Sequence, residues 1–139
     1  MIRVGLECSS SLSQHPTGVQ RYIDGVLSGF EHVENVIPTR LFKLSRWRKR
    51  LYLPKSRIAC RWYGPELGLV GRPYNVIHCM DPTLPWFSLK TPLIVTVHDA
   101  YLAIHADDIP YRKQQDKLSK LKSACARAAH IVVPTEAIK

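Results

Sequence analysis

The amino-acid sequence predicts a single α/β domain, a Rossmann-like fold in which helices cover both faces of a parallel β-sheet. Short runs of almost uninterrupted apolar residues recur along the chain, and such runs are typical of strands that are buried on both sides. Stretches with helical periodicity separate these runs, and alternating strands and helices form parallel sheets. The 139 residues suffice for one domain with a core and are too few for two. We therefore treat residues 1–139 as one domain.

The first strand is expected at residues 2–7, and the clearest helix signal follows it. Six apolar residues at helical spacing form one continuous stripe: Val19, Tyr22, Ile23, Val26, Leu27 and Phe30. Thr17 is placed to cap this helix, and Gln20, three residues later, completes a capping-box pattern. The order of strand, glycine-containing loop and helix brings a free helix N-terminus to the edge of the sheet.

Further strands are expected at residues 36–42, 76–80, 93–97 and 131–133. Pro38 removes a backbone donor from the first of them, so we expect that strand to lie at a sheet edge or to be broken. A long helix is expected at residues 111–129, and residues 134–136 begin another. The apolar side of the long helix contains Leu118, Leu121, Cys125 and Ala128.

The composition argues against several classes of protein. No apolar run reaches the roughly 18 to 20 residues that span a bilayer, and the N-terminus lacks a signal-peptide pattern, so we expect a cytoplasmic protein. Cys8, Cys60, Cys79 and Cys125 are widely spaced, which favours reduced, mostly buried thiols over disulfides or a zinc site. The sequence has neither a GxGxxG motif nor a P-loop, so a dinucleotide site or an NTPase is not supported.

The positive charge is concentrated in one stretch. The formal net charge is +9, and nine Lys and Arg residues lie between Arg40 and Arg61 without an Asp or Glu. We take Arg46, Arg48, Lys49 and Arg50 as its anion-binding patch. A local patch of this kind favours an anionic partner: a membrane surface, a phosphorylated acceptor or nucleic acid. Nucleic acid is the least favoured of the three, because no recognised nucleic-acid-binding module is present.

Three segments are placed to bind a ligand, because parallel sheets bind ligands at the carboxyl ends of their strands. They are the loop with Gly18, the segment 78–82 and the pair His98–Asp99. The helix start after the loop offers unpaired N–H groups to a phosphate or a sugar hydroxyl. A histidine at a strand end can exchange hydrogen bonds at neutral pH. A plain capped helix and a solvent-facing pair remain the alternatives, and His78 is expected to be a core histidine bonded to the backbone.

Four segments resemble glycosyltransferase family 4, the group 1 enzymes with the GT-B fold. Residues 16–22 (PTGVQRY) resemble that family's P-T-G-[IV]-x-R-Y loop, and residues 92–99 (PLIVTVHD) resemble its P-x-[VI]-x-T-[VI]-H-D segment. Residues 74–78 (YNVIH) and 126–136 (ARAAHIVVPTE) are similar to two further blocks of the family. His130 stands where the family usually has aspartate, and Thr135 where it usually has serine. The four blocks occur in the family's order and cover nearly the whole chain.

The resemblance implies a retaining, metal-independent hexosyltransferase without a cofactor. It would move a sugar from a nucleotide-sugar to a glycan or lipid-linked acceptor, as in polysaccharide biosynthesis. His98 would hydrogen-bond the transferred sugar, and Asp99 would orient His98. The substrate-binding residues implied are Gly18, Val19, Arg21, Tyr22, Asp81 and Thr135. The family's second domain, which holds the donor, has no counterpart in residues 1–139, so we expect this chain alone to be inactive.

One alternative function stays open. The same fold can serve as a non-catalytic binding module that engages an anionic lipid or polymer through residues 40–61. In that case, or if the enzyme uses a lipid-linked acceptor, we expect a peripheral position on the inner face of the cytoplasmic membrane.

Overall fold

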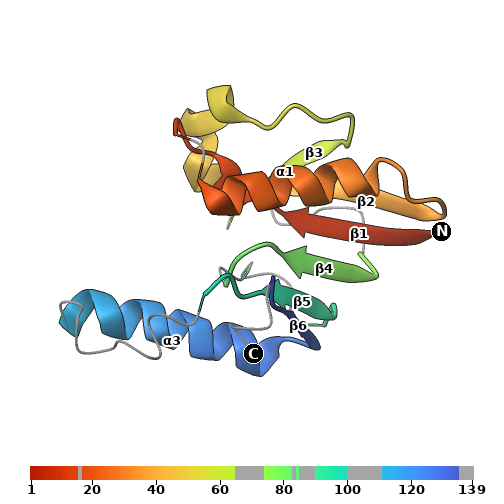
Figure 1. The fold of residues 1–139 in the computed structure, drawn as a ribbon. Helices are drawn as coiled ribbons and strands as arrows, with labels where there is room; N and C mark the ends of the chain where they lie inside the picture. The colour runs from red at the N-terminus through yellow and green to blue at the C-terminus, as the bar shows by residue number, and fades with distance from the viewer. Residues whose placement is uncertain (16, 65–73, 83, 85–89, 100–110, 135–139) are drawn as a thin grey trace.

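The computed structural model describes residues 1–15, 17–64, 74–82, 84, 90–99 and 111–134. Six parallel strands form one sheet (Figure 1), which confirms the predicted fold class. The strands are β1 (Ile2–Glu7), β2 (Val36–Lys43), β3 (Cys60–Tyr63), β4 (Val76–Cys79), β5 (Leu93–Thr96) and β6 (His130–Val132). Their order in the sheet is β3-β2-β1-β4-β5-β6, so the direction in which strands are added reverses between β1 and β4.

The described helices cover both faces of the sheet. They are α1 (Gly18–Phe30) and α3 (Tyr111–Arg127), together with two 3₁₀ helices, η1 (Ser9–Ser11) and η2 (Leu44–Tyr52). Because side chains alternate along a strand, Val4 and Leu6 of β1 face α1, whereas Gly5 and Glu7 face the opposite side. On that opposite side, Ala124 of α3 packs among residues of β4 and β5.

Each face of the sheet has its own apolar cluster. The cluster under α1 contains Val4, Leu6, Cys8, Leu12, Ile23, Leu27, Phe42, Ile58 and Met80. The cluster under α3 contains Leu41, Tyr63, Tyr74, Ile77, Cys79, Leu93, Val95, Val97 and Ala124. Ile23 and Leu27 belong to the predicted stripe of α1, so the helical periodicity identified the buried face of that helix correctly.

The N-terminus of α1 has the predicted cap. The side chain of Thr17 accepts a hydrogen bond from the backbone N of Gln20 at 3.2 Å. The reciprocal half of a capping box is not formed with any described residue, because Gln20 Oε1 is buried there without a hydrogen-bond partner. The cap fixes the point at which the chain turns from the carboxyl end of β1 into α1.

The expectation that Pro38 marks an edge strand or a break is wrong, because β2 lies between β1 and β3 and is continuous. Pairing with β3 begins only at Arg40, whose backbone N donates to the carbonyl of Ala59 at 2.9 Å. Backbone groups alternate between the two neighbouring strands, so position 38 points to the same side as position 40. Pro38 therefore lies beyond the end of the β3 ladder, where its missing donor costs little.

Two further expectations need correction. Cys8 and Cys79 are buried free thiols, but Cys60 is exposed. Arg40 is no part of a surface patch, because only 7% of it is exposed. Its guanidinium donates to the carbonyl oxygens of Ile58, at 2.9 Å, and Pro54, at 2.7 Å. This arginine therefore holds the segment before β3 against the sheet.

Candidate functional site

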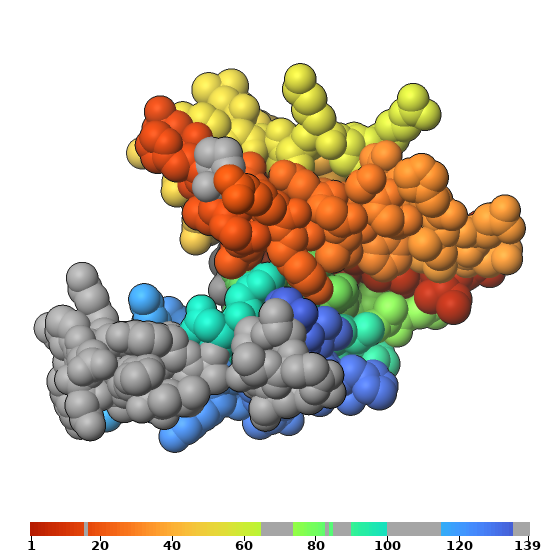
Figure 2. All heavy atoms as spheres, in the orientation of Figure 1, coloured from red at the N-terminus to blue at the C-terminus, as the bar shows by residue number. Residues whose placement is uncertain are grey.

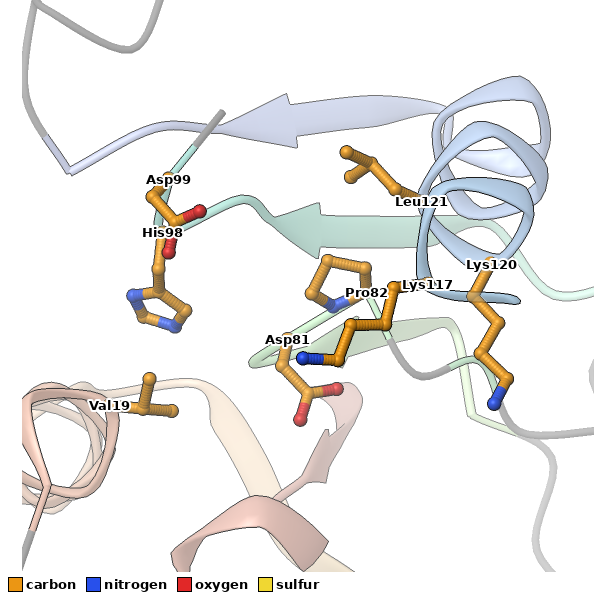
Figure 3. Close-up of a pocket in the computed structure, with 8 residues that line it drawn as sticks. All are labelled: Val19, Asp81, Pro82, His98, Asp99, Lys117, Lys120 and Leu121. Atoms are coloured by element: carbon orange, nitrogen blue, oxygen red, sulfur yellow. The ribbon is translucent and has the colours of Figure 1, made fainter. Parts of the chain in front are cut away.

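A pocket of about 250 Å³ opens at the carboxyl edge of the sheet, close to the β1–β4 switch point. Figure 2 shows the surface indented on this side, between the segments coloured red to yellow and those coloured cyan to blue. Four parts of the chain line it (Figure 3): Val19 of α1, Asp81 and Pro82 after β4, His98 and Asp99 after β5, and Lys117, Lys120 and Leu121 of α3. The switch point of an open parallel sheet is where ligands bind.

The imidazole of His98 is held by the backbone after β4. Its Nε2 lies 2.7 Å from the carbonyl oxygen of Met80. A carbonyl oxygen only accepts, so Nε2 carries the proton and Nδ1 has its lone pair available in the neutral ring. The ring of Tyr22 packs edge-on against the imidazole, with 4.9 Å between the centroids. The ring therefore has a fixed orientation at the pocket.

Tyr22 is linked to the sheet by two hydrogen bonds that share one side-chain oxygen. The Tyr22 hydroxyl lies 3.3 Å from Thr96 Oγ1, and His78 Nε2 lies 2.8 Å from the same oxygen. Burial lowers the pKa of His78, which keeps this ring neutral. His78 is thus a partly buried histidine as expected, but its bond goes to a side chain and not to the backbone. These two hydrogen bonds connect α1 with β5 and β4 next to the pocket.

The structure gathers some of the predicted site residues and separates others. Val19, Asp81, His98 and Asp99 line one pocket, and Tyr22 contacts His98. Gly18 is the exposed first residue of α1, next to the pocket but not in its wall. Arg21 is also exposed and outside the wall. Thr135 lies outside the described residues.

The sequence prediction missed the wall that α3 provides. Lys117, Lys120 and Leu121 all line the pocket. Lys120 Nζ pairs with Asp116 Oδ2 at 2.6 Å, an exposed pair one helical turn apart. From the sequence alone, these lysines are expected to be ordinary solvated residues on the surface of a helix. One signal could have predicted their position: α3 follows β5 along the chain, and a helix that follows a parallel strand starts at the carboxyl edge of the sheet.

Glu7 was also missed, and it is the most unusual ionisable residue at the switch point. It ends β1 opposite Cys79 of β4 and is fully buried. The hydroxyls of Ser9 and of Tyr63, the latter at 2.8 Å, donate to its Oε1, whereas Oε2 has no partner among the described residues. Burial raises the pKa of Glu7 to about 7, and Asp81 adds to the rise. This carboxyl group is therefore partly protonated near neutral pH.

The predicted anion patch lies on η2, at the same edge of the sheet. No residue of η2 is buried, and Arg46, Arg48, Lys49 and Arg50 are all exposed. Trp47 packs edge-on against Trp62 of β3, with 4.8 Å between the ring centroids, and Arg50 lies 5.1 Å from the Trp47 ring. The Trp47–Trp62 contact thus packs η2 against the sheet, while the four cations stay exposed.

Neither a metal centre nor a membrane span is evident in the described part of the chain. It holds no cluster of three His, Cys, Asp or Glu side chains that could bind a metal ion. None of its helices is long and apolar enough to cross a membrane.

Comparisons with protein-family models, with curated proteins and with solved structures give no match.

Proposed function

We propose that this chain is the acceptor-side half of a retaining nucleotide-sugar glycosyltransferase. The observation that carries the proposal is the meeting of His98, Asp81 and Val19, at the start of α1, around one pocket at the switch point. Two of the segments that resemble glycosyltransferase family 4, residues 16–22 and 92–99, contribute to this pocket or adjoin it. The proposal therefore rests both on the geometry of the pocket and on the sequence resemblance.

His98 has the position and the chemistry for a positioning and electrostatic role. Its protonated Nε2 is occupied by the Met80 carbonyl, so Nδ1 accepts a hydrogen bond from a sugar hydroxyl. A fixed acceptor holds the sugar in attack geometry without reorganising during the reaction. The orienting role that we expected for Asp99 stays a prediction; in the structure, the imidazole Nε2 donates to the carbonyl oxygen of Met80.

The start of α1 supplies a second element of the mechanism. The backbone N–H groups of Gly18 and Val19 open the helix and have no acceptor within it. Apart from its chain neighbours, no described residue has an atom within 4 Å of a Cβ placed at Gly18, so a diphosphate or a sugar has room to approach. The partial positive charge of the helix end favours an anionic group there.

A transfer assay tests the proposal directly. The intact enzyme, in which a donor-binding half completes the site, is incubated with a panel of labelled nucleotide-sugars and with glycan and lipid-linked acceptors, and the labelled product is counted. Residues 1–139 alone are expected to be inactive in the same assay. We expect transfer with retention of the anomeric configuration and without a requirement for divalent metal. Failure with every donor, in a protein that is folded and pure, would count against the enzyme.

A second function, docking on an anionic membrane, is favoured by one specific observation. η2 exposes apolar side chains beside its cations: 84% of Leu51, 45% of Trp47 and 38% of Tyr52 are exposed. Tyr52 also shares a cavity with Gln14 and Gln20, next to the loop that leads into α1. Docking through η2 would therefore bring a lipid-linked acceptor close to the pocket. This function is compatible with the first.

A further inference from the structure

A second cavity adjoins the pocket and has a different chemical character. It measures about 360 Å³ and shares Pro82 and Lys120 with the first pocket, so the two are neighbours. Its charged lining consists of Lys43, Lys120 and Arg127, and Ser119 and Ser123 add two hydroxyl groups. No carboxylate is among the described residues that line it. Three cations and two hydroxyls facing one hollow are a chemistry suited to a phosphoryl group.

The local structure explains why these side chains meet. Ser119, Ser123 and Arg127 follow one another at intervals of four along α3, so they share one face of that helix. Lys43 ends β2, and its backbone N donates to Ser9 Oγ at 2.8 Å, which fixes this strand end. The cavity therefore lies between one helix face and the carboxyl end of β2.

Lys43 and Arg127 line the same cavity, and both also act electrostatically on the thiol of Cys79. Burial raises the pKa of Cys79 to about 12, and the charges of Lys43 and Arg127 both act against this rise. Among the described residues, neither cation forms an ion pair with a carboxylate. Lys120 does pair with Asp116, but both side chains are 64% exposed, and such surface pairs are worth little. Arg127 and Lys120 can therefore turn to a ligand, and Lys43, whose charge also acts on the buried carboxyl group of Glu7, adds a third positive charge.

We propose that this cationic pocket, Lys43, Lys120, Arg127, Ser119 and Ser123, binds a phosphoryl group carried by the acceptor. The inference rests on the proposed function, because the neighbouring pocket with His98 would then receive the acceptor's reacting hydroxyl. A volume of about 360 Å³ lies at the low end of the range of roughly 300 to 1,000 Å³ typical of ligand sites. The planar guanidinium of Arg127 is suited to bind two phosphate oxygens at once.

Binding of inorganic pyrophosphate to the natural protein, at constant ionic strength, tests the site without any transfer reaction. We expect Lys43→Gln and Arg127→Gln each to weaken binding about tenfold, and Arg127→Lys to weaken it less. Lys122→Gln is the matched control, since it removes an exposed charge from α3 outside both pockets. Thermal melting of each variant shows whether it remains folded. Equal weakening by the control, or no saturable binding by the folded wild type, would overturn the proposal.

Two further arms separate the possible outcomes. A soluble hexose phosphate and vesicles containing phosphatidic acid distinguish a soluble acceptor from a lipid-borne one. Arg127→Gln should weaken the binding of only that probe whose phosphoryl group enters the cationic pocket. If the protein transfers sugar but Lys43→Gln and Arg127→Gln change neither pyrophosphate binding nor the acceptor KM, the cationic pocket is refuted while the enzyme stands. If pyrophosphate binds as expected and no sugar is transferred, the proposed function fails and the anion site stands.

Discussion

The Nε2 atom of His98 donates a hydrogen bond to the carbonyl oxygen of Met80, 2.7 Å away, and so couples the end of β5 to the end of β4. The bond has a chemical consequence, because it selects the tautomer that leaves Nδ1 as an acceptor. The bond also has a structural consequence, because it joins the ends of two neighbouring strands, of which β4 borders the switch point. Residues from both ends line the same pocket.

His98→Ala is expected to lower turnover on the order of a hundredfold in the intact enzyme, as loss of one preorganised hydrogen bond in an active site can do. Stability should fall by only about 1 to 2 kcal/mol, because one hydrogen bond and one ring contact are lost. Steady-state kinetics and urea unfolding measure the two effects. His130→Ala, which removes an exposed histidine at the start of β6, is the control and should keep full activity. Undiminished turnover in His98→Ala would refute the role of His98.

Glu7 is expected to make the protein less stable as the pH rises from about 4.5 to 7. Its folded-state pKa is raised from 4.5 to about 7, mainly by burial, so the folded state holds the proton more tightly than the unfolded state does. The stabilisation is complete below pH 4.5 and is lost as the pH rises through 7. A shift of this size corresponds to about 3 kcal/mol. Urea unfolding at a series of pH values measures the loss.

Glu7→Gln isolates this contribution, because the amide has the shape of the protonated acid and does not titrate. His78 has an opposite pH dependence, since its lowered pKa makes stability fall as the pH drops. His78 is present in both proteins and cancels when they are compared. The variant should therefore gain up to about 3 kcal/mol relative to wild type between pH 4.5 and 8. Parallel stability curves for the two proteins would show that Glu7 titrates normally. Glu34→Gln, at an exposed position, serves as control.

Gly5→Ala and Gly25→Ala should change stability in opposite directions. A Cβ at Gly5 would lie 2.9 Å from Leu41 Cδ1 and 3.2 Å from Ile77 Cγ1, and both of these side chains are buried. Overpacking of this kind costs about 1 to 3 kcal/mol. A Cβ at Gly25, on the exposed side of α1, would meet nothing within 4 Å. Alanine there should add up to about 1 kcal/mol through helix propensity. Urea midpoints that move in the same direction would contradict this packing analysis.

Local patterns in the sequence sufficed for most of the fold. The stripe of α1 and the Thr17 cap follow from spacing and from one side-chain bond, and both are present. The position of β2 inside the sheet could not be predicted. Pro38 is tolerated there only because β3 is short and pairs with β2 from Arg40 onward. β3 itself has four residues and no strong pattern. Its place depends on Arg40, which the sequence alone presents as one surface cation among nine.

The candidate site was predictable only in part, for a similar reason. His98, Asp81 and Val19 could be found because the carboxyl-edge rule needs only strand order along the chain. The lysines of α3 and the buried state of Glu7 depend on packing between elements far apart in the sequence. Tyr63, one of the residues that bury Glu7, is 56 positions away. No local pattern encodes such a contact.

Docking through η2 predicts binding to anionic vesicles that fades with salt. Each cation near an acidic surface contributes about 1 kcal/mol, so the four exposed cations of η2 would supply about 4 kcal/mol, enough for reversible attachment. Co-sedimentation should therefore show binding to vesicles with anionic lipid, none to neutral vesicles, and loss when Arg48, Lys49 and Arg50 become glutamine. Leu51→Ser should weaken binding even at low salt, because the apolar side chain no longer enters the interface. Replacing three exposed cations elsewhere, Arg3, Lys90 and Lys122, changes the net charge equally and should have a smaller effect. If both triple variants lose binding equally, the attraction is a property of the whole charged surface and not of η2.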